Sequence, residues 1–471
     1  MSKRAGKSRS RLLSRRAAGW VDDRFGAANF ATKALSKVFP DHFSFLFGEI
    51  ALYCFMVLIA TGVYLTFFFT PGTNTVTYHG KYAPLAGQHV SAAYASSIHL
   101  SFDVRLGLFF RQMHHWAALV FLAAIVAHLC RIFFTGAFRR PRELNWILGM
   151  TLLLLAILNG FAGYSLLDDL LSGTGLRIGY SIAQSIPLIG NHLAFWVWGG
   201  EFPGNVINQR LFIAHVLIVP ALIAGVLGAH LASVWHQTHT QFPGKGRKED
   251  NVVGSRLWPT YGARSLSMGL AVVSVLALLG GLFQINPVWL YGPYDPSTVS
   301  TAAQPDWYMG WVEGALRLFP AWEVRIGSYS LPNPFFPAVL MPGITFLVLF
   351  LWPFIDKRLT GDFDEHHILE RPRDRPWRAA LGVGAFTFYT VLFVAGGNDV
   401  IANRIGVSVN GMTDTLRAVV FVLPVITAAV TWRWCRDLKR GEEAAEAAGP
   451  DETQTVDDPP PTPDPVPATA R

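Results

Sequence analysis

The sequence RQMHHWAALVFLAAIVAHLCR, residues 111–131, decides the fold, and RLFIAHVLIVPALIAGVLGAH, residues 210–230, repeats its pattern. Each stretch belongs to an apolar segment long enough to cross a bilayer as a helix. His114 and His128 are 14 residues apart, and His215 and His230 are 15 residues apart. At about 100° per residue, both separations come within about 60° of four full turns. Each helix therefore presents two imidazoles on roughly one face, about 21–22 Å apart along its axis.

Two such helices, packed together, would form two bis-histidine sites at different depths in the membrane. A planar iron porphyrin requires this arrangement, with one axial nitrogen on each side held by a rigid support. A single intramembrane histidine is more often a hydrogen-bonding group or part of a proton path. Four histidines in phase on two helices are hard to explain in that way. The adjacent His115 falls near the opposite helix face from His128, so we expect it to be structural or interfacial.

The whole chain has the composition of a membrane protein. Of its 471 residues, 51% are hydrophobic and only 15% are charged, and the mean hydropathy is +0.32. Apolar runs long enough to span a bilayer occur at eight places: 45–69, 113–135, 145–167, 211–234, 265–285, 335–355, 379–396 and 417–435.

Basic loops alternate with loops that are poor in Lys and Arg. This pattern places both termini in the cytoplasm and predicts a multi-pass protein of the cell's inner (plasma) membrane. The sequence pI of about 9.3 follows from this topology and from contact with membrane lipids. We therefore predict no nucleic-acid partner.

The expected fold is an all-α polytopic membrane protein with eight transmembrane helices, the first four forming a dihaem four-helix bundle. Its predicted regions are a basic cytoplasmic segment (1–43), the four-helix region (44–255), a C-terminal region of four helices (256–436) and a disordered acidic, Pro-rich cytoplasmic tail (437–471). Cys54, Cys130 and Cys435 form no CxxC or CxxCH motif. Any haem is therefore expected to be bound non-covalently, and the cysteines to pack within the bundle.

Two pairs of glycines repeat the histidine spacing. Gly48 and Gly62 are 14 residues apart in the first span, as are Gly149 and Gly163 in the third. Because glycine has no side chain, a porphyrin edge or a neighbouring helix can approach these positions closely. The pairs predict a bundle wrapped around two stacked macrocycles.

Two arginines flank the histidines of the second span. Arg111 precedes His114 by three residues, and Arg131 follows His128 by three. Near the helix ends, each guanidinium is expected to pair with haem propionates. The alternative is an ordinary arginine whose charged end reaches the membrane surface.

Together these motifs resemble the cytochrome b subunit of cytochrome bc complexes, the quinol–cytochrome c oxidoreductases. The resemblance covers roughly residues 40–436, and it is carried also by FAGY at 161–164, IPLIGNHLAFWVWGG at 186–200 and QPDWY at 304–308. It implies a low-potential haem b on His114 and His215 at the outer side. A high-potential haem b would lie on His128 and His230 at the cytoplasmic side. Length, tails and the PDWY variant are most similar to actinobacterial members, which use menaquinol.

The resemblance also implies a reaction and its partners. A quinol is oxidised at an outer site, one electron passes to a Rieske iron–sulfur protein, and the other passes through both haems to a quinone at the cytoplasmic site. This Q cycle contributes to the proton gradient, so the complex is a translocase. A c-type cytochrome subunit and a homodimeric complex are implied, and a supercomplex with a terminal oxidase is compatible with them.

The quinol-site motif of the family, Pro-Glu-Trp-Tyr, appears here as Pro305-Asp306-Trp307-Tyr308. Asp306 is expected to be catalytic, because a carboxylate beside the quinol hydroxyl can take its proton. Aspartate is one methylene shorter than glutamate, so its reach must be compensated or a water must bridge the gap. Tyr308 and Tyr164 are expected to line the same cavity.

The family usually continues Gly-Tyr-x-Leu-Pro-Trp at residues 163–168, but here the proline is lost and two carboxylates, Asp168 and Asp169, appear near the expected outer quinol pocket. They are either alternative proton acceptors or a solvated helix end. For the cytoplasmic quinone site the candidates are His236 and His239, after the fourth span, Arg264, before the fifth, and Asp41 with His42, before the first.

Two other protein classes also place histidines inside membrane helices. One is the dihaem membrane anchor of a dehydrogenase or hydrogenase, which usually has fewer helices and lacks a PDWY-like outer loop. The other is a proton-coupled transporter, which would bind no haem, so a reduced-minus-oxidised optical spectrum separates it from the cytochrome.

Overall fold

The computed structural model describes residues 16, 19–298, 300 and 303–448. Within this part of the chain, eight helices are long and apolar enough to cross a membrane, and each contains most or all of one predicted span. They run over Phe43–Thr66, Gly107–Phe134, Glu143–Leu167, Ile207–Gln237, Leu257–Leu282, Phe336–Thr360, Pro376–Gly396 and Val409–Ala445. The predicted all-α membrane fold is confirmed.

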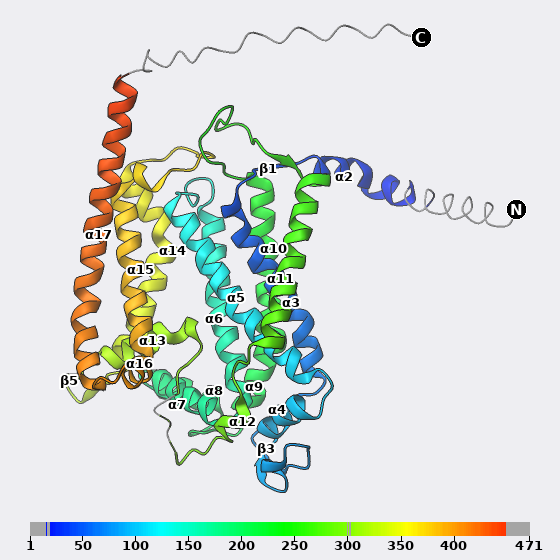
Figure 1. Cartoon of the computed structure of the whole chain (residues 1–471), viewed down its shortest axis with the longest axis vertical. Coiled ribbons are helices and arrows are strands. Elements are labelled where there is room, and N and C mark those ends of the chain that lie inside the picture. Colours follow the sequence, from blue (N-terminus) through cyan, green and yellow to red (C-terminus); the bar gives the residue numbers. More distant parts are fainter. Residues whose placement is uncertain (1–15, 17–18, 299, 301–302, 449–471) are drawn as a thin grey trace, which may run out of the picture.

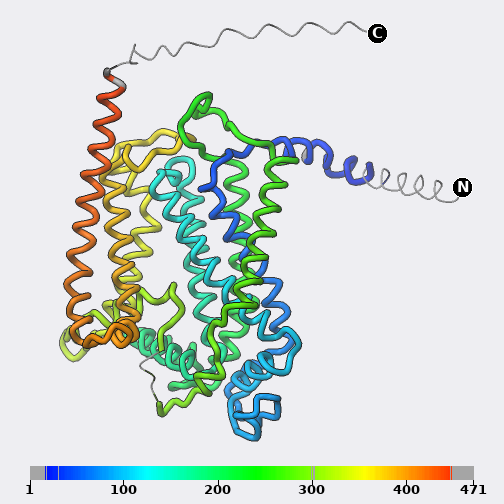
Figure 2. Tube along the Cα trace, viewed as in Figure 1, coloured from blue at the N-terminus to red at the C-terminus, as the bar shows by residue number. Residues whose placement is uncertain are grey.

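The spanning helices fall into two groups that lie side by side (Figure 1). The first group contains α3 (Leu46–Thr66), α5 (Gly107–Phe134), α6 (Glu143–Tyr164), α9 (Ile207–Ile213) with α10 (Val219–Gln237), and α11 (Gly262–Leu282). The second group contains α14 (Met341–Thr360), α15 (Pro376–Gly396) and α17 (Val409–Ala448). The tube in Figure 2 traces the same order and shows α17 along one edge.

Shorter elements connect these helices. They are α2 (Ala27–Leu35), α4 (Ala92–Phe102), α7 (Leu170–Gln184), α8 (Gly190–Trp198), α12 (Val288–Tyr291), α13 (Gly310–Leu318) and α16 (Asn398–Ile405). Three antiparallel ribbons pair β1 (Val38–Phe39) with β4 (Ser255–Arg256), β2 (Thr75–Thr77) with β3 (His89–Ser91), and β5 (Val324–Ile326) with β6 (Tyr329–Leu331). Helices α7, α8 and α12 lie at one end of the bundle, whereas α2 and the C-terminal end of α17 lie at the other (Figure 1).

The last helix is longer than predicted. It continues through residues 437–448, which the sequence analysis assigned to the disordered tail. The reason is local: DLKRGEEAAEAA consists mostly of strong helix formers, and the first proline comes only at position 450. The rest of the predicted tail (449–471) and residues 1–15 of the basic N-terminal segment lie outside the described residues.

A π-helical segment interrupts the fourth span at Ala214–Ile218, between α9 and α10. It contains His215, and Pro220 follows without an N–H for the next helical hydrogen bond. A π segment accommodates one extra residue within a helix. The 15-residue separation of His215 and His230 therefore behaves like the 14-residue separation on α5.

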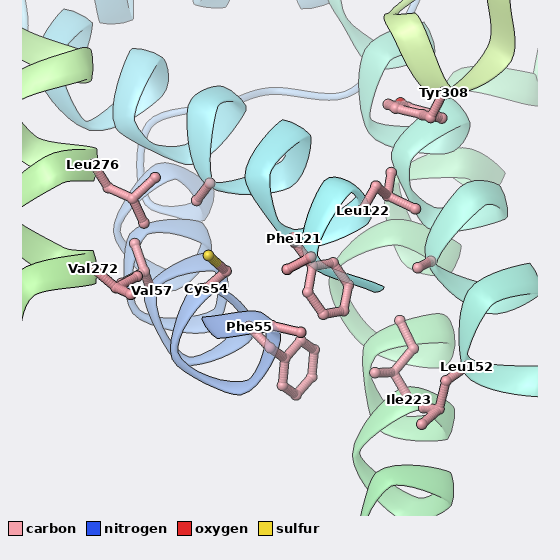
Figure 3. Packing of buried hydrophobic residues seen from close by; sticks show 14 of the residues in the cluster. Cys54, Phe55, Val57, Phe121, Leu122, Leu152, Ile223, Val272, Leu276 and Tyr308 are labelled. Carbon is pink, nitrogen blue, oxygen red and sulfur yellow. The ribbon is translucent and has the colours of Figure 1, made fainter. Parts of the chain in front are cut away.

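An apolar cluster fills the middle of the first group of helices, and Figure 3 shows it from close by. Phe55 of α3 and Phe121 of α5 stack with their ring centroids 5.9 Å apart. Cys54 is fully buried in this cluster, as predicted for a packing residue. Since Phe121 lies midway between His114 and His128 in the sequence, the cluster separates the two histidine levels.

Candidate functional site

The four histidines form two facing pairs between α5 and the fourth span. The ring centroids are 6.1 Å apart for His114 and His215, the first pair, and 6.5 Å apart for His128 and His230, the second pair. With a metal–nitrogen bond of about 2.0 Å and about 1.1 Å from that nitrogen to the ring centre, imidazoles on opposite sides of one iron would have centres about 6.2 Å apart. Both pairs fit this spacing.

Each predicted glycine faces one of these rings. A Cβ atom built on Gly62 would lie 3.3 Å from His114 Cε1, and one on Gly48 would lie 3.4 Å from His128 Cε1. On α6, the same construction gives 2.3 Å between Gly163 and His215 Cε1, and 3.7 Å between Gly149 and His230 Cε1. The glycine spacing therefore places all four positions at the histidine levels.

Three of the histidine rings are oriented through Nδ1. His114 Nδ1 lies 2.8 Å from Thr61 Oγ1, and because that hydroxyl donates to the Val57 carbonyl, it accepts from the imidazole. The backbone carbonyls of Asn159 and Asn145 lie 2.9 Å and 3.2 Å from Nδ1 of His215 and His230. Such bonds fix the tautomer and leave Nε2 for a metal.

Sequence reasoning missed these second partners. The two asparagines are themselves 14 residues apart, so the same periodicity could have revealed them. Thr61 carries no comparable signal.

Both arginines expected to bind propionates have guanidinium nitrogens without partners. Nε and one terminal nitrogen of Arg111, and the same two atoms of Arg131, are buried and unpaired within the described residues. Arg111 uses its other terminal nitrogen to donate to the Asn286 carbonyl at 3.0 Å. Buried unpaired guanidinium groups suit an anionic ligand.

A bare metal ion does not fit the described residues as well as a porphyrin does. They contain no group of three or more His, Cys, Asp or Glu side chains able to hold a metal ion. Two facing imidazoles leave the remaining coordination positions to a planar macrocycle. The residues present therefore fit a haem at each pair.

A cavity of about 580 Å³ joins the first pair to the PDWY motif. Asp306, Tyr308 and Tyr164 all line it, together with Arg111 and both histidines of the first pair. Its volume is in the range of small-molecule sites. The three residues that the sequence analysis placed in one cavity are thus brought together.

His115 occupies a position that sequence reasoning did not anticipate. Its Nε2 donates to Asp306 Oδ1 over 2.8 Å, with side-chain exposures of 14% and 16%. Tyr308 donates to the other carboxylate oxygen over 3.2 Å. Burial, with Asp306 beside it, raises the pKa of Tyr308 well above its usual value, so its hydroxyl remains a donor. No local pattern could link residues 115 and 306, which are 191 positions apart.

Sequence comparison agrees with this geometry. A family model described as cytochrome b (N-terminal)/b6/petB matches residues 119–293. The chain is 52% identical over 422 residues to the cytochrome bc1 complex cytochrome b subunit of Corynebacterium diphtheriae, covering 90% of this chain and 78% of the relative. The subunit of the same name from Streptomyces coelicolor is 46% identical over 428 residues, covering 91% and 78%.

This chain belongs to the family of cytochrome b subunits of bc1 complexes. Its similarity to these relatives, and to the subunit from Mycobacterium leprae at 51% identity over 425 residues (90% of this chain, 77% of the relative), confirms the predicted resemblance to actinobacterial members. A solved structure entitled "Hyperthermophilic respiratory Complex III" shares the fold, with a TM-score of 0.64 and 20% identity over 88% of this chain and 100% of its own. Family membership implies that the chain binds haem b in the membrane.

In this cytochrome b, the PDWY motif opens a short helical turn. Pro305 is half-buried before the 3-10 segment Trp307–Met309, and the rings of Trp307 and Tyr308 meet edge to face with centroids 6.2 Å apart. Helix α13 follows directly and anchors the motif to the second group of helices.

Asp169 is not part of a solvated helix end. It is fully buried and caps α7, accepting from the backbone N–H groups of Leu171 and Ser172 over 2.8 Å and 2.9 Å. Asp168 stands before it with a φ of 55°, a left-handed conformation that stops the preceding helical turn. Burial raises the pKa of Asp169 to about 6 and also raises that of Asp168.

On the side of the second pair, two of the predicted quinone-site residues, Arg264 and His236, are exposed. Arg264 forms a surface ion pair with Asp41 over 2.5 Å, and its side chain is 60% exposed. His236 is exposed at the end of α10, whereas the His239 ring packs at a tilt against Phe39 with centroids 4.7 Å apart. Burial and nearby cations lower the pKa of His239 to about 4. His239 is therefore the histidine turned toward the protein.

Proposed function

We propose that this chain is the dihaem, quinol-oxidising subunit of a respiratory bc1 complex that works by a Q cycle with menaquinol. The observation that carries the proposal is the single cavity shared by His114, His215 and Asp306. Haems bound at the two histidine pairs would supply one-electron transfer across the membrane, the first at low and the second at high potential. A quinol in the cavity has two electrons and two protons to give up.

The residues around the cavity determine where a quinol proton can go. The Asp306 carboxylate accepts it from the quinol hydroxyl, because it is the carboxylate that lines the cavity. His115 and Tyr308 each hold one carboxylate oxygen, so the short side chain is fixed in position. Tyr164, from α6, is placed to bind the quinol from another wall.

The proposed partners follow from the reaction and the family. One electron leaves for a Rieske iron–sulfur protein and onward to a c-type cytochrome subunit, in a dimeric complex that acts as a quinol–cytochrome c oxidoreductase and translocase. Arg139 and Arg142 lie in the loop after α5, and Arg375 lies just before α15. Both loops are at the same end of the bundle as α2 (Figure 1). This charge distribution supports a plasma-membrane protein whose termini are cytoplasmic.

Asp306→Asn tests the proposal, with Asp306→Glu as the matched variant. The Asn variant should retain both haems and oxidise quinol more slowly by about 10² or more, the usual contribution of a positioned acid–base group. The Glu variant should keep substantial activity. Haem content by optical spectroscopy and steady-state quinol oxidation by the purified complex are the measurements. Normal turnover of the Asn variant would transfer the role to Asp168.

A further inference from the structure

Glu49 is an ionisable residue in the first turn of a membrane-spanning helix, and the proposed function so far gives it no role. Each of its two carboxylate oxygens accepts a hydrogen bond from a hydroxyl group, one on α11 and one in the turn before it. Tyr261 donates to Oε1, and Ser265 donates to Oε2 over 2.7 Å. Tyr53 donates in turn to Ser265 Oγ over 2.9 Å, since the serine proton is used on Glu49.

This network lies beside the second histidine pair. Gly48, the neighbour of Glu49, is the position where a Cβ would lie 3.4 Å from the His128 ring. On the other side, the Tyr261 ring stacks on Phe39 with centroids 4.5 Å apart, and Phe39 packs at a tilt against His239. The ribbon between β1 and β4 fixes this wall by pairing Phe39 with Ser255.

The charges around Glu49 leave its carboxyl group without a counter-ion. Within the described residues, no Lys, Arg or His side chain forms an ion pair with it. Arg264, on the same helix as Ser265, is already paired with Asp41 at the surface. Arg131 of α5 lies over the Phe45 ring, 4.2 Å from its centroid. A membrane carboxyl held only by hydroxyls can change its protonation state without breaking an ion pair.

We propose that Glu49 supplies a proton to the quinone that is reduced beside the second histidine pair. The inference rests on the proposed function, which delivers the electrons. A quinone takes up two electrons and two protons to become quinol. The Glu49 carboxyl gives one proton to a quinone oxygen, and cytoplasmic water supplies the second proton to the other oxygen. The resulting Glu49 carboxylate recovers a proton from the cytoplasm through the hydroxyls of Tyr261 and Ser265.

The test compares Glu49→Gln and Glu49→Asp with Glu143→Gln in the purified complex. Glu143 is a fair control because it also lies in the first turn of a membrane helix at this end, but pairs with Lys357 over 3.7 Å. Glutamine can accept one hydroxyl hydrogen bond through its amide oxygen and donate to the other hydroxyl from its NH2 group, so the packing of α3 on α11 should be retained. It cannot release an acidic proton.

Three measurements apply to each variant: haem content, single-turnover reduction of the first haem by quinol, and oxidation of the second haem by added menaquinone analogue. Redox-induced infrared difference spectra add a readout independent of turnover. Glu49→Gln should slow oxidation of the second haem at least tenfold and remove a carboxyl band, while Glu49→Asp retains part of both. Glu143→Gln should match the wild type.

Ser265→Ala is a second variant that keeps the carboxyl group. It should shift the same infrared band and slow oxidation of the second haem. Wild-type rates and an unchanged carboxyl band in Glu49→Gln, with normal quinol oxidation, would overturn the role of Glu49 alone. Failure of the wild-type chain to reduce its first haem with quinol would overturn the proposed function and this inference with it.

Discussion

The glycines that face the histidine rings allow a graded test of the two haem sites. A Cβ at Gly163 would lie 2.3 Å from His215 Cε1, whereas one at Gly149 would lie 3.7 Å from His230 Cε1. Unbonded carbons prefer separations of about 3.5–4.0 Å. Gly163→Ala therefore requires the His215 ring to move by about 1.2 Å or more, while Gly149→Ala requires no movement.

If His215 holds a haem as proposed, the iron would restrain its ring, so the ring could not rotate away at little cost. A metal–nitrogen bond of about 2.0 Å would be strained by a shift of this size. Overpacking of a tight site costs about 1–3 kcal/mol, which corresponds to roughly 5- to 150-fold weaker haem binding. Alanine favours the helix over glycine by about 1 kcal/mol, so α6 itself should not be weakened by the substitution.

Haem per chain, measured as the pyridine haemochrome of the purified complex, checks this reasoning. The haem content of Gly163→Ala should fall toward one haem per chain, and its spectrum should lose the component of the first pair. The haem content of Gly149→Ala should stay at two per chain. Two intact haems with unchanged spectra in Gly163→Ala would refute it. So would a larger loss in Gly149→Ala.

Three further substitutions test individual contacts. Thr61→Val removes the acceptor for His114 Nδ1 and should raise the midpoint potential of the first haem in a potentiometric titration. Thr66→Val is the control and should not change the potential, because the Thr66 hydroxyl bonds only to its own helix. Equal potentials in the two variants would contradict the assigned hydrogen bond. Arg111→Gln should weaken haem retention at the first pair while the second pair stays loaded, and equal loss from both would argue against a propionate contact. Because burial raises the pKa of Asp169 to about 6, ionisation of this carboxyl costs stability as the pH rises through 6. Asp169→Asn keeps the helix cap without the charge. Its stability relative to the wild type, measured by thermal unfolding, should therefore improve between pH 5 and pH 8 by on the order of 1–3 kcal/mol. A stability difference that does not depend on pH would contradict the raised pKa of Asp169.

Local patterns in the sequence determined much of this protein. The length and apolarity of the runs predicted all eight spans, because a bilayer requires about 20 apolar residues of helix. The period of the α-helix placed four histidines and four glycines at two common depths. The same period separated His115 from its neighbour His114; the two rings have different partners, Asp306 and Thr61, although both line the same cavity.

Only the tertiary structure decided which distant residues meet. It joined His115 to Asp306, turned Asp169 into a buried cap, and set Glu49 against Tyr261 and Ser265. It also placed the π segment that brings His215 and His230 into phase. The physical reason is that helix periodicity is fixed by backbone geometry within a few residues, whereas contacts between helices depend on how side chains from separate segments fill shared space.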